Sequence, residues 1–150
     1  MKKQLIIAAM SALAWSAEPA YAACTGTALT QTELLAILPN HTVCGRPGSS
    51  YPGGENSPDR WQEQHVGSNA KGDLVDYKKG PADPIDPSKS VGTYAIVSGQ
   101  VNHNYGAGAS FTYSVFQSST VYSFCEGTSE RARATVKSGL TSCSSGDYPP

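Results

Sequence analysis

The sequence lacks any apolar run long enough to cross a membrane. Its longest such run, Leu5 to Trp15, has 11 residues, whereas a transmembrane helix needs about 20. It also lacks an excess of positive charge, because 11 lysines and arginines are balanced by 12 aspartates and glutamates. Basic surfaces supply most non-specific binding to nucleic acid and attract proteins to anionic membranes. The sequence therefore predicts neither a transmembrane segment nor a nucleic-acid partner.

Motifs that hold catalytic groups at a fixed spacing are also missing. The chain has no G-x-S-x-G elbow, no HxH or HExxH pair and no CxxC pair. Those spacings would indicate a serine hydrolase, a metal site on one element, or a zinc or redox cysteine pair. We therefore predict no cofactor and no metal, and rank enzymatic activity last among the functions considered.

Residues 1–22 have the three parts of a secretory signal peptide: a basic start, an apolar centre and a small-x-small triplet ending at Ala22. We therefore expect export to the periplasm or the extracellular space. The mature chain, residues 23–150, keeps nine basic and eleven acidic side chains and suits a single domain. Lipidation at Cys24 is an alternative, but Tyr21 stands where a lipoprotein signal prefers an aliphatic residue.

Four cysteines lie in the mature part, Cys24, Cys44, Cys125 and Cys143. An even number in an oxidising compartment predicts two disulfides. Of the three connectivities, we favour Cys24 with Cys44 and Cys125 with Cys143, since each closes a local loop of roughly 20 residues. Pairing of Cys44 with Cys125 stays open.

Apolar and polar residues alternate with a period of two through most of the mature chain, which indicates β-strands. The segments that fit are 42–45, 60–66, 73–78, 91–98, 100–105, 110–117, 120–125 and 131–137. Short connections such as Gly99 predict consecutive antiparallel hairpins. The predicted fold is mainly β: a seven- or eight-stranded antiparallel meander that forms a small barrel or a strongly curved sheet, with 131–137 at an edge. A β-sandwich is the competing architecture.

One short helix is predicted before the strands, over residues 31–38. Thr30 and Glu33 have the spacing of a capping box, and apolar residues follow. Because these residues cover more than half of the helix surface, the helix is expected to close one end of the barrel or to cross the sheet. Two segments rich in proline and glycine, 46–60 and 80–87, are predicted to be loops.

Polar and aromatic side chains share faces on two of the predicted strands. Trp61, Glu63 and His65 alternate on one strand, and His103 and Tyr105 on another. If both faces point into a barrel, they form a polar cluster in an aromatic cavity, which suits a small organic ligand better than a metal. The predicted ligand-binding residues are Trp61, Glu63, His65, Tyr77, His103 and Tyr105. The alternative is that these histidines each make one hydrogen bond and face water.

Several short motifs resemble those of a group of small exported proteobacterial proteins to which no activity is assigned. They are Asn40-His41-Thr42-Val43-Cys44, Trp61-Gln62-Glu63-Gln64-His65, Asp76-Tyr77-Lys78-Lys79-Gly80, Asp83-Pro84-Ile85-Asp86-Pro87, Val91-Gly92-Thr93-Tyr94 and Tyr122-Ser123-Phe124-Cys125. The resemblance spans most of the mature chain. It implies export and β architecture, and it transfers no catalytic residue.

These observations favour a non-enzymatic binding module that holds a small ligand on the aromatic face of a barrel. The alternative is a protein-binding inhibitor or envelope structural factor that acts through the loop 46–60. The predicted partner is accordingly a small molecule or an envelope protein. The two hypotheses differ in where the partner binds, inside the barrel or on an outer loop.

Overall fold

A computed structural model of the 150-residue chain describes residues 24–51, 57–79 and 89–150. The predicted signal peptide and the predicted loop 80–87 lie outside the described residues, as do residues 52–56 of the loop 46–60. Within strand residues 76–79 only the backbone is described.

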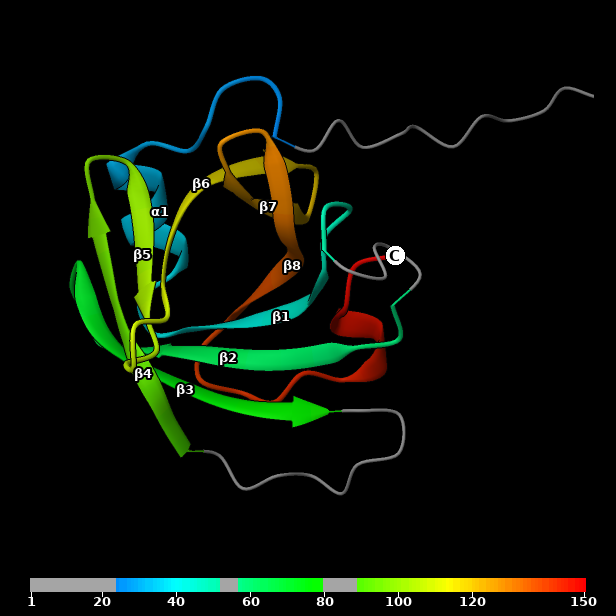
Figure 1. Cartoon of the computed structure of the whole chain (residues 1–150). Coiled ribbons are helices and arrows are strands. Elements are labelled where there is room, and N and C mark those ends of the chain that lie inside the picture. The colour runs from blue at the N-terminus through cyan, green and yellow to red at the C-terminus, as the bar shows by residue number, and fades with distance from the viewer. Residues whose placement is uncertain (1–23, 52–56, 80–88) are drawn as a thin grey trace, which may run out of the picture.

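The described residues form one α-helix, eight strands and a short 3-10 turn (Figure 1). In chain order these are α1 (Gln31–Ile37), β1 (His41–Pro47), β2 (Arg60–Val66), β3 (Lys71–Lys79), β4 (Lys89–Val97), β5 (Gln100–Asn104), β6 (Ser110–Ser118), β7 (Val121–Glu126), β8 (Ser129–Ser138) and η2 (Ser145–Asp147). The mainly β composition and the single short helix confirm the predicted fold class.

The strands follow one another around a closed antiparallel barrel, so the sandwich alternative is wrong. Closure is made by β8 pairing with β1, in a register that runs from His41 opposite Ser138 to Pro47 opposite Ala132. The prediction that 131–137 forms an edge strand is therefore also wrong. Closure gives hydrogen-bond partners to the backbone groups that would otherwise lie at two free edges. The alternation of side chains in one strand cannot reveal whether the sheet closes.

Helix α1 covers one end of the barrel, beside β5 in Figure 1. The Thr30–Glu33 capping box starts the helix as predicted. The Gln31 side chain holds the β4–β5 turn, donating to the Ile96 carbonyl at 2.9 Å and accepting from the Gly99 amide at 2.9 Å. Leu34 on α1 is fully buried in the barrel core, so this end is filled with apolar side chains. No helix in the described ranges has the length and apolar character of a membrane span.

All four cysteines form disulfides, but the favoured local pairing is wrong. Cys24 bonds to Cys125 on β7, and Cys44 on β1 bonds to Cys143, with sequence separations of 101 and 99 residues. The barrel explains this result, because its meander brings the last strands back beside the first. The Cys24 sulfur is occupied by this bond, which argues against thioether lipidation at that residue.

The C-terminal segment is fastened to the outside of β1, β2 and β8 (Figure 1, red). The Cys143 amide donates to the Gln62 side chain at 2.6 Å next to the Cys44–Cys143 disulfide. Lys137 forms an ion pair of 2.7 Å with Asp147 on η2. These bonds bury Gln62 on the outward face of β2, whose other outward residues stay partly exposed.

A cavity at the open end of the barrel

In the part of the chain that the structure describes, the end of the barrel opposite α1 leads into a cavity of about 350 Å³. Its rim carries the polar residues Asp59 and Arg131 together with Tyr51, which is 44% exposed. The remaining lining residues are mostly aromatic or apolar: Pro47, Trp61, Glu63, Tyr105, Phe111, Tyr113 and Ala132. This volume is within the usual range for small-molecule sites, about 300–1,000 Å³.

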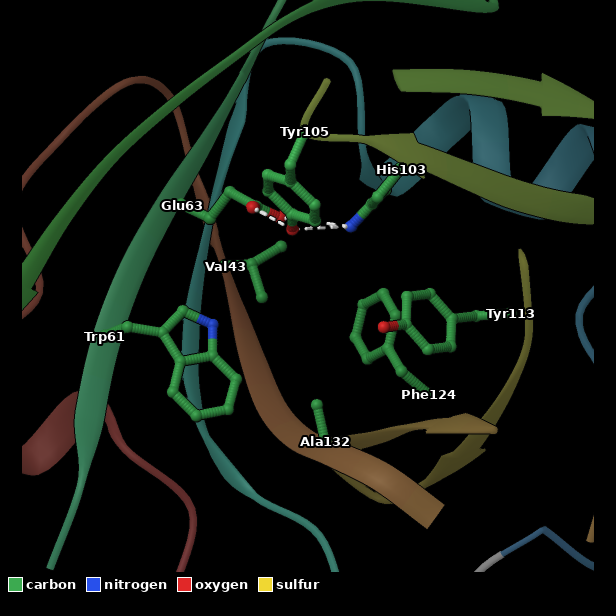
Figure 2. Close-up of a pocket in the computed structure, with 8 residues that line it drawn as sticks. All are labelled: Val43, Trp61, Glu63, His103, Tyr105, Tyr113, Phe124 and Ala132. Atoms are coloured by element: carbon green, nitrogen blue, oxygen red, sulfur yellow. Dashed lines mark hydrogen bonds and ion pairs between the residues drawn. The ribbon is translucent and has the colours of Figure 1, made fainter. Parts of the chain in front are cut away.

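A deeper pocket of about 100 Å³ shares several of these residues and extends to the floor of the cavity. Side chains from opposite walls point into it: Trp61 and Glu63 on one side, Tyr113 and Phe124 on the other (Figure 2). Trp61 lies flat against β1 because residue 45 is glycine. A Cβ at Gly45 would meet the indole ring at 2.5 Å, so any larger residue there would displace the ring.

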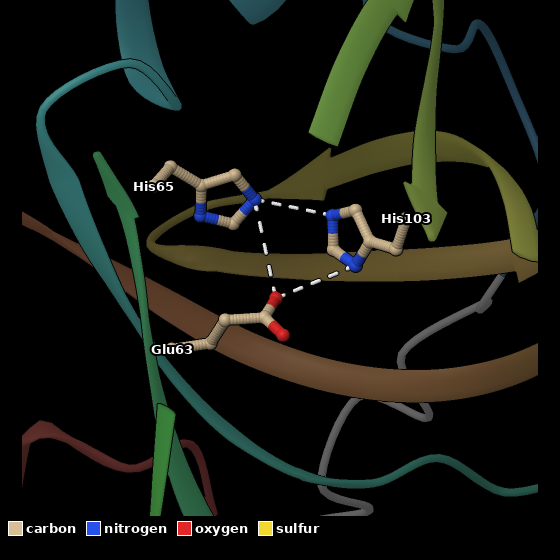
Figure 3. Close-up of side chains that lie close together, drawn as sticks. All are labelled: Glu63, His65 and His103. Atoms are coloured by element: carbon tan, nitrogen blue, oxygen red, sulfur yellow. Dashed lines mark hydrogen bonds and ion pairs between the residues drawn. The ribbon is translucent and has the colours of Figure 1, made fainter. Parts of the chain in front are cut away.

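Four polar side chains meet at the floor of this pocket. Tyr105 donates its hydroxyl proton to Glu63 Oε2 at 2.6 Å. The other oxygen of Glu63 lies 3.3 Å from His103 Nδ1 (Figure 2). The Nε2 atoms of His103 and His65 are 3.1 Å apart, and His65 Nε2 lies 4.0 Å from Glu63 Oε1 (Figure 3). The side chains of Glu63 and both histidines are at most 5% exposed.

Burial controls the charge of this cluster. It raises the pKa of Glu63 to about 7, against the opposing effect of the Tyr105 hydrogen bond. It lowers the pKa of His103 to about 3. Burial also holds the pKa of His65 well below its ordinary value, and the nearby His103 and His41 add to this lowering. Both rings of the His65–His103 pair are therefore neutral at neutral pH.

One arrangement of protons is consistent with the contacts that the two neutral rings make. His103 Nδ1 lies 3.2 Å from the Tyr105 hydroxyl oxygen and 3.3 Å from Glu63 Oε1, so its proton is shared between these two acceptors, which leaves His103 Nε2 as an acceptor for the Nε2–H of His65. His65 Nδ1 has no hydrogen-bond partner among the described residues, although it is buried. The polar groups of the cluster that face the cavity therefore have hydrogen-bond partners, whereas His65 Nδ1, beneath them, has none among the described residues.

The structure brings together most of the residues predicted to bind a ligand. Trp61, Glu63, His103 and Tyr105 line the cavity. His65 is fully buried beneath them, against the ring of Tyr94 at a centroid distance of 4.8 Å, and reaches the cavity only through His103 and Glu63. The side chain of Tyr77 lies outside the described part of the structure.

Sequence reasoning missed much of the opposite wall, which is supplied by β6, β7 and β8. Its residues are Phe111, Tyr113, Phe124, Arg131 and Ala132. The Tyr113 ring stacks on Phe111 at a centroid distance of 6.2 Å and meets Phe124 edge-on at 5.9 Å. The alternation along β6 and β7 could have identified the aromatic residues, because one side of each strand faces the barrel interior. That inference requires knowing that β2 and β5 face the same interior.

Comparisons with protein-family models, with curated proteins and with solved structures find no match to this chain. The site must therefore be interpreted from its own chemistry. Neither a serine nor a cysteine is among the residues that line the described cavity, so it offers no nucleophile of the type used in acyl transfer. Aromatic walls over a buried polar floor are the arrangement by which pockets bind and orient small molecules.

Proposed function

We propose that the protein is a non-enzymatic binding module that holds a small aromatic or partly apolar molecule inside its barrel. The observation that carries this proposal is the cavity of about 350 Å³ that ends on the Glu63–His103–Tyr105 cluster. An apolar body can pack on Trp61 and Tyr113, while a polar end reaches the cluster at the floor.

The construction of the barrel supports a binding role. One end is filled by apolar side chains beneath α1, and among the described residues the cavity opens at the rim that carries Tyr51. The two disulfides join strands and termini that are about 100 residues apart in sequence, which keeps the walls in place without the ligand. A preformed site loses less entropy on binding than one that must be ordered.

The same disulfides support the proposal that the protein works outside the cytoplasm, in the periplasm or the extracellular space, where such bonds persist. The described parts of the loop 46–60, including Tyr51 and Asp59, contribute to the cavity rim. We therefore favour a small-molecule ligand over a protein partner that binds this loop.

Trp61 makes the proposal testable, because it is the only tryptophan after residue 22 and its ring lines the cavity. We expect 2-naphthamide, a neutral two-ring probe, to bind with one-to-one stoichiometry and to change the Trp61 emission. Native mass spectrometry of protein purified without reduction would show in parallel whether a molecule is already retained.

A cavity-filling variant identifies the binding site. Ala132→Phe places a ring in the cavity and should weaken probe binding by about tenfold or more, since buried volume is taken from the ligand. Ala36→Phe is the matched control, because Ala36 is exposed on α1 at the closed end. Equal binding by both variants, or no binding by the parent protein, would contradict the proposal.

A further inference from the structure

We propose that Glu63, His65 and His103 form a binding site for one divalent transition-metal ion at the floor of the barrel. One potential ligand atom from each of these buried residues lies within 4.8 Å of the others (Figure 3). This site is argued independently of the organic ligand proposed above, and either can exist without the other.

The distances are close to those of a coordination sphere. Ligand atoms bound at 2.0–2.1 Å to one ion are separated by about 2.9 Å in octahedral and about 3.4 Å in tetrahedral geometry. The two Nε2 atoms of His65 and His103 are 3.1 Å apart, within that interval. Glu63 Oε1 lies 4.0 Å from His65 Nε2 and must approach by about 0.6 Å for tetrahedral or about 1.1 Å for octahedral spacing, which is within the reach of a side chain with three rotatable bonds.

The ligand types define the class of ion. Two imidazole nitrogens and one carboxylate oxygen suit zinc, iron, cobalt, nickel or copper, whereas calcium and magnesium prefer an all-oxygen set. The Nε2 atoms of His65 and His103 lie 3.1 Å apart, and coordination by both requires each ring to carry its proton on Nδ1. The Glu63 carboxylate offsets one of the two positive charges of a bound divalent ion.

The surroundings of the three residues resemble the outer shell of a metal site. The Tyr105 hydroxyl bonds Glu63 Oε2 at 2.6 Å, which orients the carboxylate and leaves Oε1 towards the histidines. Hydrogen bonds of this kind fix ligand orientation in metal sites. Glu63 and His103 also line the cavity, so an ion can enter from the mouth and keep open coordination positions on that side.

A purely structural role explains the cluster less well. A buried polar network that is only partly satisfied costs stability relative to apolar residues of similar size. Here the two histidines use their Nε2 atoms on each other, whereas His65 Nδ1 lacks a partner within the described residues with or without an ion and does not decide between the two roles. Coordination gives both Nε2 atoms the same favourable partner.

The test is titration of the mature, disulfide-bonded protein with Zn²⁺ after treatment with EDTA and dialysis. All four cysteines are in disulfides, so thiolates do not contribute to the signal. We expect calorimetry to show one Zn²⁺ per chain. Co²⁺ should bind in the same place, give visible d–d absorption and quench Trp61, which lines the same pocket.

Variants of the three histidines distinguish this site from adventitious binding. His65→Gln and His103→Gln should each weaken Zn²⁺ binding by at least about tenfold. His41→Gln should leave it unchanged, because His41 lies at the start of β1 with its Nδ1 on the Pro39 carbonyl at 2.8 Å. Tyr105→Phe should weaken binding by about tenfold while leaving the stoichiometry at one, as expected of a positioning residue.

Absence of Zn²⁺ binding by the folded parent protein would overturn the proposal, as would equal losses in His41→Gln and His103→Gln. Near-ultraviolet circular dichroism checks that each variant is folded, and Glu63→Gln provides a third ligand variant if a histidine variant does not fold. Binding of 2-naphthamide in EDTA is measured separately. If 2-naphthamide binds and zinc does not, the metal site is rejected and the proposed function stands. If zinc binds and 2-naphthamide does not, the metal site stands and the proposed function is rejected.

Discussion

Glu130 is the most constrained carboxylate in the described part of the barrel. It is 1% exposed and accepts hydrogen bonds from Ser123 Oγ at 2.6 Å, from the Ser49 amide at 3.0 Å and from Arg133, whose guanidinium forms an ion pair at 2.9 Å. A buried ion pair contributes little net stability when complete, but removing one partner leaves an uncompensated charge. Glu130 therefore joins β7, β8 and the segment after β1 at a single point.

We expect Glu130→Ala to lower the free energy of unfolding by about 3 kcal/mol, because the Arg133 charge loses its carboxylate in a buried setting. Urea unfolding monitored by Trp61 fluorescence would measure the change. The control is Glu126→Ala, which breaks the Glu126–Arg131 ion pair, whose side chains are 38% and 36% exposed. That pair is solvated, so its loss should cost at most about 1 kcal/mol. Similar losses in the two variants would contradict this account.

The same carboxylate should contribute to acid sensitivity. Burial alone would raise the pKa of Glu130, but hydrogen bonds from Arg133, Ser123 and Ser49 outweigh it and hold the pKa below its ordinary value of 4.5. An acid with a lowered folded-state pKa stabilises the fold above its unfolded-state pKa, and this stabilisation is lost as the pH falls through the folded-state value. In Glu130→Gln this contribution is absent at every pH.

The unfolding free energies of the parent and Glu130→Gln should therefore differ by a constant amount above about pH 5 and converge below about pH 4.5. Urea titrations between neutral pH and about pH 3 would measure the difference. A gap that widens in acid would show that Glu130 is not the group responsible.

At the scale of elements, the positions of the strands could be predicted from the sequence. The pairing of the strands with one another could be predicted only in part. Alternation located β2 at residues 60–66, exactly as observed, and the capping box located α1. The pairing of β8 with β1 and the two disulfides join residues about 100 positions apart. No local pattern encodes such contacts, because loop entropy favours short loops and the barrel overrides that preference.

The disulfide connectivity can be checked directly by digestion without reduction. Trypsin leaves Cys24 and Cys44 in one peptide, since Arg46 precedes proline, and an additional cut after Glu33 separates them. Mass spectrometry should then find the peptide ending at Glu33 joined to the Cys125 peptide. It should find the Cys44 peptide joined to that of Cys143. A Cys24–Cys44 link would show that the barrel seen here is not the oxidised fold.

At the scale of the whole molecule, closure of the barrel is what creates the candidate site. His65 and His103 are 38 residues apart and lie on β2 and β5, which are not neighbours in the sheet. The sequence could place each histidine on a strand face, but their meeting across the interior depends on the curvature and closure of eight strands. The spacing rules that detect metal sites on single helices or loops therefore did not apply here.

The two proposals together predict a dependence of organic-ligand binding on metal. Without a metal, the floor residues Glu63, His65 and His103 offer no positive charge to an anionic ligand, whereas a divalent ion with open positions attracts it. Saturating Zn²⁺ should therefore tighten binding of 2-naphthoate by about tenfold or more, equivalent to about 1.4 kcal/mol. It should change binding of the neutral 2-naphthamide much less. Trp61 fluorescence measures both affinities, and His103→Gln should abolish the difference. Equal effects of Zn²⁺ on the two probes would mean that ion and ligand do not meet in the barrel.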